Sequence, residues 1–152
     1  MSTPTAPLDK TEAGRIVERA RVRHGLTWAQ LAEAIGRPPV WTVAALLGRH
    51  PVPGAEAEAI AKLLELGEEV VEALQLQPTR VADPDAPSDP TIYRFYEALS
   101  VYGPALKALI HEEFGDGIMS AINFNLGIER VEHPDGARIR ITMEGKYLPY
   151  AW

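Results

Sequence analysis

The sequence predicts an α+β protein, with an all-α, helix-turn-helix-like bundle in its N-terminal half and an α+β domain in its C-terminal half. Apolar residues recur at helical spacing in the first half, whereas in the second half two helical patterns are followed by strand-like alternation. Between the halves, the stretch 77–90 contains four prolines and three aspartates, which no helix or strand interior tolerates. We therefore expect a helical domain at 1–80, a linker at 81–90 and a second domain at 91–152.

The composition limits the class of protein. The 152 residues are 46% hydrophobic, which is enough for a packed core. The net charge of −6 and the pI near 5.2 argue against a protein that coats nucleic acid or an anionic membrane. No run of about 18 apolar residues is present, and the N-terminus lacks the basic and apolar segments of an export signal. We therefore expect a cytoplasmic protein with no nucleic-acid or membrane partner.

Metal and thiol chemistry are not expected. The chain has no cysteine, which excludes disulfides, thiol nucleophiles and thiolate ligands. The histidines lack the HxxxH or HxH spacing that is typical of a metal site. They are His24, His50, His111 and His133.

The N-terminal half predicts a series of short helices. Thr27 is a suitable N-cap with Gln30 three residues later, and Gly36 ends that helix before Pro38 and Pro39 begin the next one. The predicted ranges are 10–24, 27–35, 39–47, 55–66 and 68–76.

The second and third of these helices are similar to a helix-turn-helix, in which the second helix reads DNA bases. Base readout in the major groove uses Arg, Lys, Asn, Gln or similar groups, and PVWTVAALLG offers only Thr42. A helical bundle used for packing or subunit contact is therefore favoured over DNA binding. The alternative function is a helix-turn-helix transcriptional regulator with a C-terminal oligomerisation domain.

Two helices are predicted after the linker. Asp89 is a suitable N-cap with Pro90 at the first helical position, and Gly103 should end the first helix. Pro104 near its start and Gly115 at its end define the second helix, which is amphipathic.

Arg94 and Glu97 lie near each other on the polar side of the first of these helices. An Arg and a Glu at this spacing usually form a solvated pair that contributes about 0.3 kcal/mol. Here Tyr93, Phe95 and Tyr96 surround the pair, so burial at an interface is the alternative.

A strand is predicted after Gly117, and Ser120 is a polar residue in one of its apolar rows. If side chains alternate regularly, the row also contains Ile118, Ile122, Phe124 and Leu126. A hydroxyl in such a row either forms a local hydrogen bond or lines an apolar pocket.

The rest of the tail predicts a small sheet. HPDG at 133–136 is a hairpin turn, ARIRITM alternates as a strand, and a second turn is expected at Glu144-Gly145. So few strands, with one apolar face between them, do not form a stable sheet alone. We expect a second copy of the chain to cover the sheet, which predicts an oligomer.

The segment 89–150 resembles the C-terminal domain of the cyanase family, whose members are also called cyanate hydratases or cyanate lyases. The resemblance lies in the motifs YRFYE, KALIHE-FGDGI-SAI and GKYLP, and TVAALLG in the first half is more loosely similar. It implies a C-terminal dimerisation and catalytic domain with intertwined strands. It also implies a homodecamer, a pentamer of dimers with sites shared between subunits, and a helical domain that does not bind DNA.

The same resemblance implies the activity. Bicarbonate would attack the cyanate carbon, the adduct would lose carbon dioxide to leave carbamate, and carbamate would give ammonia and a second carbon dioxide. This reaction detoxifies cyanate and supplies nitrogen. No cofactor is implied, because bicarbonate is a co-substrate. The family's catalytic residues correspond to Arg94 and Glu97 in YRFYE and to Ser120 in GIMSAI.

These residue types suit that chemistry. Bringing two small anions to about 4 Å costs roughly 4 kcal/mol at an effective dielectric constant of about 20. Arg94 supplies a permanent charge with a planar fork, and Ser120 can orient an anion without adding charge. Glu97 would orient Arg94 or hold a proton. Ser120 is not expected to be a nucleophile, because IMSAI is not a G-x-S-x-G elbow and no His and Asp partners are evident.

Overall fold

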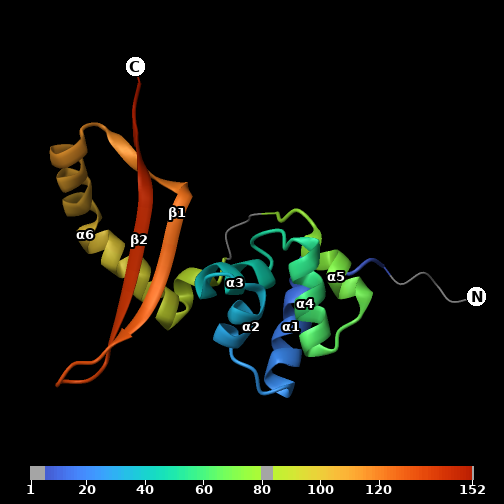
Figure 1. Ribbon diagram of the computed structural model, residues 1–152. Helices are drawn as coiled ribbons and strands as arrows, with labels where there is room; N and C mark the ends of the chain where they lie inside the picture. The colour runs from blue at the N-terminus through green and yellow to red at the C-terminus, as the bar shows by residue number, and fades with distance from the viewer. Residues whose placement is uncertain (1–5, 80–83, 152) are drawn as a thin grey trace, which may run out of the picture. The chain divides into compact units, whose positions relative to one another are not determined.

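The computed structural model describes residues 6–79 and 84–151. The chain divides into two compact units, Met1–Arg80 and Val81–Trp152, and each is described by itself (Figure 1). Part of the predicted linker, residues 81–83, lies outside the described residues. The rest of it contains the short 3-10 helix η1, Ala86–Ser88.

The first unit is entirely helical, as predicted. Each helix begins and ends within two residues of its predicted bounds. The helices are α1 (Lys10–Arg23), α2 (Trp28–Ile35), α3 (Pro39–Leu46), α4 (Gly54–Leu64) and α5 (Glu68–Gln75) (Figure 1).

Local capping explains where α2 begins and ends. The Thr27 hydroxyl accepts a hydrogen bond from the Gln30 amide at 3.1 Å, and the Gln30 side chain accepts one from the Thr27 amide at 2.8 Å. Gly36 adopts the left-handed conformation, with φ 66°, and ends the helix. The predicted capping box and glycine stop are confirmed.

The buried apolar core of the described residues lies in the first unit. The helices pack their apolar stripes against one another, and the side chains at the centre are inaccessible to solvent. The largest of them are Leu31, Leu46, Ile60, Leu64 and Leu74.

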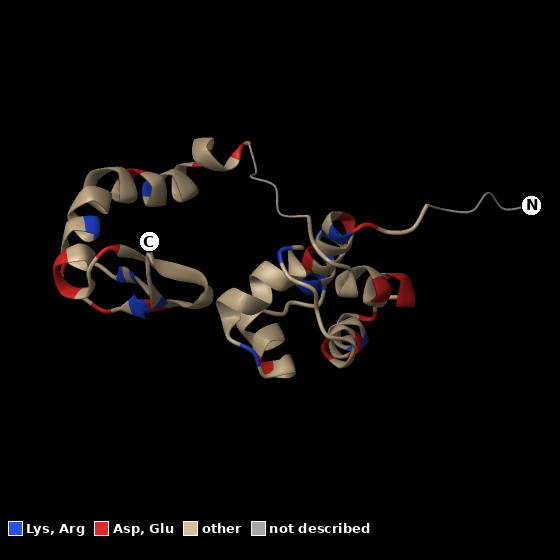
Figure 2. Ribbon diagram, turned by 90° about the horizontal axis from the view of Figure 1, so that it is seen from above, with Lys and Arg blue, Asp and Glu red and all other residues tan. Residues whose placement is uncertain are grey.

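Helix α3 occupies the place of a recognition helix but carries no exposed base-reading group. Its only hydrogen-bonding side chain outside the tryptophan, that of Thr42, is fully buried and donates to the Pro38 carbonyl at 2.9 Å. PVWTVAAL contains no charged residue, so the helix is tan throughout in Figure 2. The surface of α3 therefore lacks the donors and acceptors that major-groove readout needs.

The second unit begins with one long helix, α6 (Pro90–Phe114), where two helices were predicted. The expected break at Gly103 and Pro104 is wrong. Gly103 does not adopt the positive φ of a helix stop, and the helix continues through Pro104. A proline inside a helix removes one backbone hydrogen bond and bends the helix rather than always ending it. Figure 1 shows α6 curving along its length.

A two-stranded antiparallel sheet follows, formed by β1 (Gly117–Val131) and β2 (Arg138–Pro149). The hairpin turn at 133–136 is confirmed, with the Gly136 amide bonded to the His133 carbonyl at 3.0 Å. The second turn expected at Glu144-Gly145 is wrong. Both residues pair with β1, opposite Asn125 and Phe124, so β2 runs straight through them.

A bulge of four residues interrupts β1. Met119 pairs with Tyr147 and Phe124 pairs with Gly145, so residues 120–123 lie opposite Lys146 alone. Because of this bulge the predicted regular alternation from Ile118 to Leu126 is wrong.

The solvent exposure of the bulge residues also departs from regular alternation. The Ser120 side chain is almost fully buried, whereas Ile122, which regular alternation would place beside it, is 97% exposed.

The second unit has no buried apolar core among its described residues. Only Gly117 and Ser120 are buried there, while large apolar side chains of α6 and both strands are exposed. They include Phe95, Tyr96, Leu99, Leu109, Ile128, Ile139 and Met143. No helix in the described parts of the chain is long and apolar enough to cross a membrane.

Candidate active site

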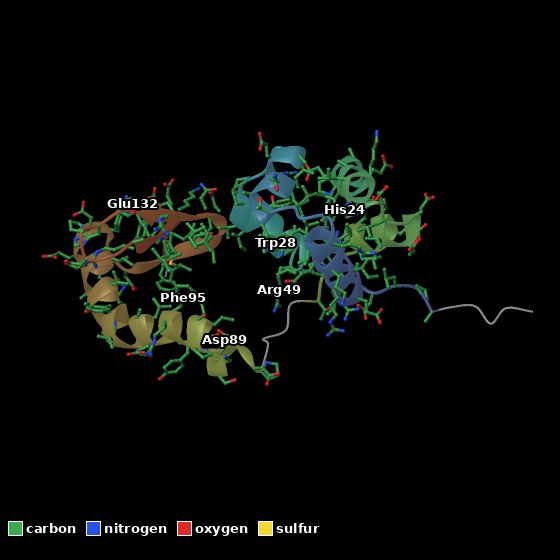
Figure 3. All side chains as sticks on the ribbon, turned by 90° about the horizontal axis from the view of Figure 1, so that it is seen from below. His24, Trp28, Arg49, Asp89, Phe95 and Glu132 are labelled. Atoms are coloured by element: carbon green, nitrogen blue, oxygen red, sulfur yellow. The ribbon has the colours of Figure 1, made fainter. Side chains whose placement is uncertain are left out.

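Arg94 and Glu97 lie in the first turns of α6, and the start of this helix fixes their direction. The Asp89 carboxylate caps the helix by accepting hydrogen bonds from the amides of Thr91, at 2.8 Å, and Ile92, at 3.0 Å (Figure 3). One turn later, Nη1 of Arg94 lies 2.5 Å from Oε2 of Glu97. The pair is exposed within one chain, at 74% and 47% for the two side chains. Its guanidinium is therefore available to a further ligand.

Ser120 lies at the start of the β1 bulge and holds the bulge closed. Its hydroxyl oxygen accepts hydrogen bonds from the backbone amides of Ile122, at 3.1 Å, and Asn123, at 3.0 Å. A serine hydroxyl has two acceptor lone pairs and one proton. Both lone pairs are used by the chain itself, so the proton is what Ser120 can offer to a ligand.

The two hydrogen bonds explain why a polar residue can be buried in an otherwise apolar stretch of β1. The local hydrogen bonds account for the burial of Ser120, which is 6% exposed. They also leave the hydroxyl as a fixed donor. Because its oxygen is held by two amides, Ser120 suits hydrogen-bond donation to an anion better than nucleophilic attack.

Within a single chain, two of the three predicted site residues, Arg94 and Glu97, are in contact. Arg94 and Glu97 form an ion pair, whereas the Ser120 hydroxyl bonds to two amides of its own bulge. Among the described residues, no hydrogen bond or ion pair joins Ser120 to the α6 pair. The grouping of all three in one site stays a prediction.

A cavity of about 410 Å³ lies between the second half of α6 and the start of β1. Its walls are mostly apolar, and the residues with polar side chains that line it are Lys107, His111, Asp116 and Tyr150. Nε2 of His111 lies 3.8 Å from Oδ1 of Asp116, and the Asp116 carbonyl accepts a hydrogen bond from the Tyr147 hydroxyl at 3.2 Å. These contacts join the end of α6 to the sheet.

One residue beside Ser120 was not predicted to be near the site. Gly145, on β2, lies so close to the Ser120 carbonyl that a β-carbon there would overlap it. The only signal was a glycine next to a glutamate, which predicted a turn. In the parts of the chain that the structure describes, no three His, Asp or Glu side chains are grouped so that they could hold a metal ion.

Two family models match the chain and together span most of it. The model described as "Cyanate hydratase, N-terminal" matches residues 10–78, and the model described as "Cyanate lyase C-terminal domain" matches residues 84–152. The second range contains Arg94, Glu97 and Ser120.

Individual relatives agree with these matches. The "Cyanate hydratase" of Mycolicibacterium vanbaalenii is 57% identical over 146 residues, covering 95% of each chain, and that of Dechloromonas aromatica is 51% identical over 144 residues, covering 94% of this chain and 98% of its own. The crystal structure of cyanase from T. urticae matches with a TM-score of 0.80 and 34% identity, covering 90% of this chain and 96% of that one. The chain thus belongs to the cyanate lyase family of enzymes, also called cyanate hydratases or cyanases.

Proposed function

We propose that this enzyme decomposes cyanate with bicarbonate as co-substrate, using Arg94, Glu97 and Ser120. The observation that carries the proposal is the 57% identity, along 95% of the chain, to a relative named cyanate hydratase. The donor-only hydroxyl of Ser120 and the exposed guanidinium of Arg94 add a chemical reason, because both suit small anions.

The proposed reaction balances as follows. A bicarbonate oxygen bonds to the cyanate carbon, and the nitrogen takes up two protons, one from bicarbonate and one from solvent. The bond between that oxygen and the bicarbonate carbon then breaks, which releases carbon dioxide and leaves carbamate. Carbamate then takes up another proton and breaks its C–N bond to give ammonia and a second carbon dioxide. Bicarbonate is the nucleophile, so no side chain forms a covalent intermediate and no cofactor is required.

Arg94 would offset the repulsion between the two anions. At about 4 Å this repulsion is roughly 4 kcal/mol at an effective dielectric constant of about 20. The planar guanidinium can bind two oxygens of one anion or one oxygen from each. Glu97, which already contacts Nη1, would hold the guanidinium in one orientation and leave its other donors for the substrates.

Ser120 would fix the position of one anion by donating its proton. An oriented donor that needs no reorganisation during the reaction stabilises developing negative charge more than water does. The two amides of the bulge hold the oxygen in place, so the direction of the donor is set before substrate binds.

We propose that the exposed apolar surface of the second unit is covered by another copy, with strands of two chains intertwined. Apolar side chains such as Leu99, Ile128 and Ile139 are between 52% and 77% exposed in one chain, a cost that association removes. A pentamer of such dimers, a homodecamer, with Ser120 of one subunit meeting Arg94 and Glu97 of another, would complete the site. The expected cytoplasmic location stays a prediction.

Ammonia release from cyanate tests this function. Purified protein is incubated with cyanate in buffer that contains bicarbonate and in buffer from which bicarbonate has been rigorously removed. We expect ammonia only when bicarbonate is present, with two molecules of carbon dioxide per ammonia. No ammonia from folded, oligomeric protein in either buffer would refute the proposal.

A further inference from the structure

Gly145 lies on β2 directly across the sheet from the end of the Ser120 bulge. It pairs with Phe124, the first residue of β1 after the bulge, and precedes Lys146, which faces the bulge alone. The shifted register brings the Ser120 carbonyl against the α-carbon of Gly145.

Gly145 is required for space, not for an unusual backbone angle. A β-carbon at this position would overlap the carbonyl oxygen of Ser120, and it would lie 2.5 Å from Cγ of Met119 and 3.2 Å from Cδ2 of Phe124. Gly145 is not among the described residues with positive φ, so its backbone is one that alanine can adopt. The flexible Met119 side chain can move away, but the Ser120 carbonyl is main chain and moves only with Ser120 itself.

We infer that Gly145 is the positioning residue for Ser120: by leaving room for the Ser120 carbonyl, it sets where the Ser120 hydroxyl proton points. This inference rests on the proposed role of Ser120 in binding an anion. A methyl group at position 145 would push the carbonyl back by roughly 1 Å, to an ordinary C···O separation of about 3.3 Å. The hydroxyl and the two amides that hold it belong to the same tight bulge and would shift with it.

A displacement of that size matters for catalysis. A misplacement of about 1 Å in an active site lowers the rate by about 100-fold, because a donor loses both its distance and its angle to the developing charge. The same displacement leaves the other pairs of the β1–β2 ladder, from Asn125 to Val131, in register. The effect should therefore be confined to the bulge.

The test compares Gly145→Ala with Gly127→Ala. Gly127 is also a β1–β2 ladder glycine, paired with Thr142, but a β-carbon there would meet nothing within 4 Å. Ammonia release is measured at several cyanate and bicarbonate concentrations, with the oligomer mass checked by sedimentation. We expect kcat/KM to fall about 100-fold for G145A and less than about twofold for G127A, with the oligomer mass unchanged in both.

A second measurement reports on the bulge without using activity. Amide hydrogen exchange is followed in the assembled proteins at Ile122 and Asn123, whose amides donate to Ser120, and at Ile128, farther along β1. We expect G145A to exchange faster than wild type at Ile122 and Asn123 but not at Ile128. In Ser120→Ala, which already lacks the acceptor, adding G145A should speed exchange at these two amides no further.

Each outcome decides the inference. It is overturned if G145A keeps wild-type kcat/KM, or if its exchange at Ile122 and Asn123 stays at the wild-type rate. It is also overturned if G145A fails to assemble or exchanges faster along the whole strand, because the glycine would then serve the sheet in general. If the wild type itself releases no ammonia, the proposed function fails, and the exchange pattern at the bulge still decides whether Gly145 positions Ser120.

Discussion

Arg37 and Glu56 join the turn between α2 and α3 to α4 through a bidentate ion pair. Nε of Arg37 lies 2.9 and 3.1 Å from the two carboxylate oxygens of Glu56, and its Nη2 lies 2.9 Å from Oε1. The guanidinium also lies over the Trp41 ring, 4.4 Å from its centroid. The Glu56 side chain is only 21% exposed. The turn of the helix-turn-helix-like pair is thus held against α4 by a partly buried contact.

Glu56→Gln should lower the free energy of unfolding by about 1–3 kcal/mol, because charge-assisted hydrogen bonds withdrawn from solvent are worth that much. The control is Glu132→Gln. Glu132 pairs with Arg130 at 2.6 Å, but the two side chains are 78% and 73% exposed, so the loss should stay within about 0.5 kcal/mol. Urea unfolding at one fixed protein concentration measures both. Equal losses would show that the Arg37 pair is no stronger than a surface pair.

The protein should not bind DNA specifically. Thr42 is buried within α3, and Arg37 is occupied by Glu56 and Trp41. With neither base readers nor a free arginine at this turn, the expected Kd for duplex DNA at physiological salt is no tighter than about 10⁻⁴ M, the weak end of nonspecific binding. Fluorescence anisotropy with random and promoter-length duplexes measures it. Nanomolar binding to any duplex would restore the transcriptional regulator as a candidate.

The helices of the first unit could be predicted because their signals are local. Thr27, Gln30 and Gly36 form a cap and a stop within ten residues of sequence, and the structure contains that cap and that stop. Asp89 likewise predicted where α6 begins, since an N-cap acts on amides two and three residues away. Such contacts depend little on the rest of the fold.

The predictions of secondary structure were wrong where contacts with residues far away in the sequence decide the local structure. Pro104 is typical of a helix start, yet α6 continues through it, so the long helix is not set by its local sequence. Gly145 was predicted to lie in a turn, but its pairing with Phe124 of β1 places it in a strand. Its lack of a side chain leaves room for the Ser120 carbonyl. The bulge that displaces Ile122 comes from the same pairing. The register between two strands cannot be predicted from the alternation of apolar and polar residues in either strand alone.

The residues of the candidate site carry no local signal that groups them. The spacing of Arg94, Glu97 and Ser120 in the sequence does not indicate that they share a site. All three were predicted from the resemblance to the cyanase family. What the structure adds is the chemistry of Ser120, whose two lone pairs are taken by backbone amides.

Arg94→Leu should lower kcat/KM for cyanate by at least about 100-fold while leaving the oligomer mass unchanged. The guanidinium is the positive group of the proposed site, and removing one such electrostatic contact typically costs 10²–10³-fold, as a rough range. Arg130→Leu is the matched control, because Arg130 is equally exposed, at 73%, and also pairs with a glutamate. Ammonia release and sedimentation measure the two effects. Loss of assembly in R94L alone would make Arg94 a structural residue.

Ser120→Ala should abolish measurable turnover and also lower the free energy of unfolding by about 1–3 kcal/mol, because the amides of Ile122 and Asn123 lose their acceptor. The control is Ser100→Ala. Ser100 donates to the Tyr96 carbonyl at 2.8 Å on the exposed surface of α6, so its removal should change stability by no more than about 0.5 kcal/mol. Ammonia release and urea unfolding are measured on the same samples. Retained turnover in S120A would remove Ser120 from the site.

Lys10 is a charged residue in the buried interior of the first unit. Its ammonium donates to the carbonyl oxygen of Leu74, which also accepts a hydrogen bond from the Val52 amide at 2.9 Å. If Lys10 is replaced, the Leu74 carbonyl therefore still accepts a hydrogen bond from the Val52 amide. Burial lowers the pKa of Lys10 below 10.5, its usual value, because desolvation disfavours the charged form.

The sign of the pH dependence follows from proton binding. At a pH between the lowered pKa of folded Lys10 and 10.5, the unfolded chain holds a proton that the folded chain has released. Stability then rises with pH, since the unfolded state binds more protons. The free energy of unfolding of wild type minus that of Lys10→Met should accordingly increase as the pH rises towards 10.5 and level off above it, while remaining flat in the range where both states are protonated. Urea unfolding of the two proteins across this alkaline range measures the difference. A difference that falls with pH would mean that the hydrogen bond to Leu74 stabilises the ammonium more than burial disfavours it, and a flat one would mean that the two effects cancel.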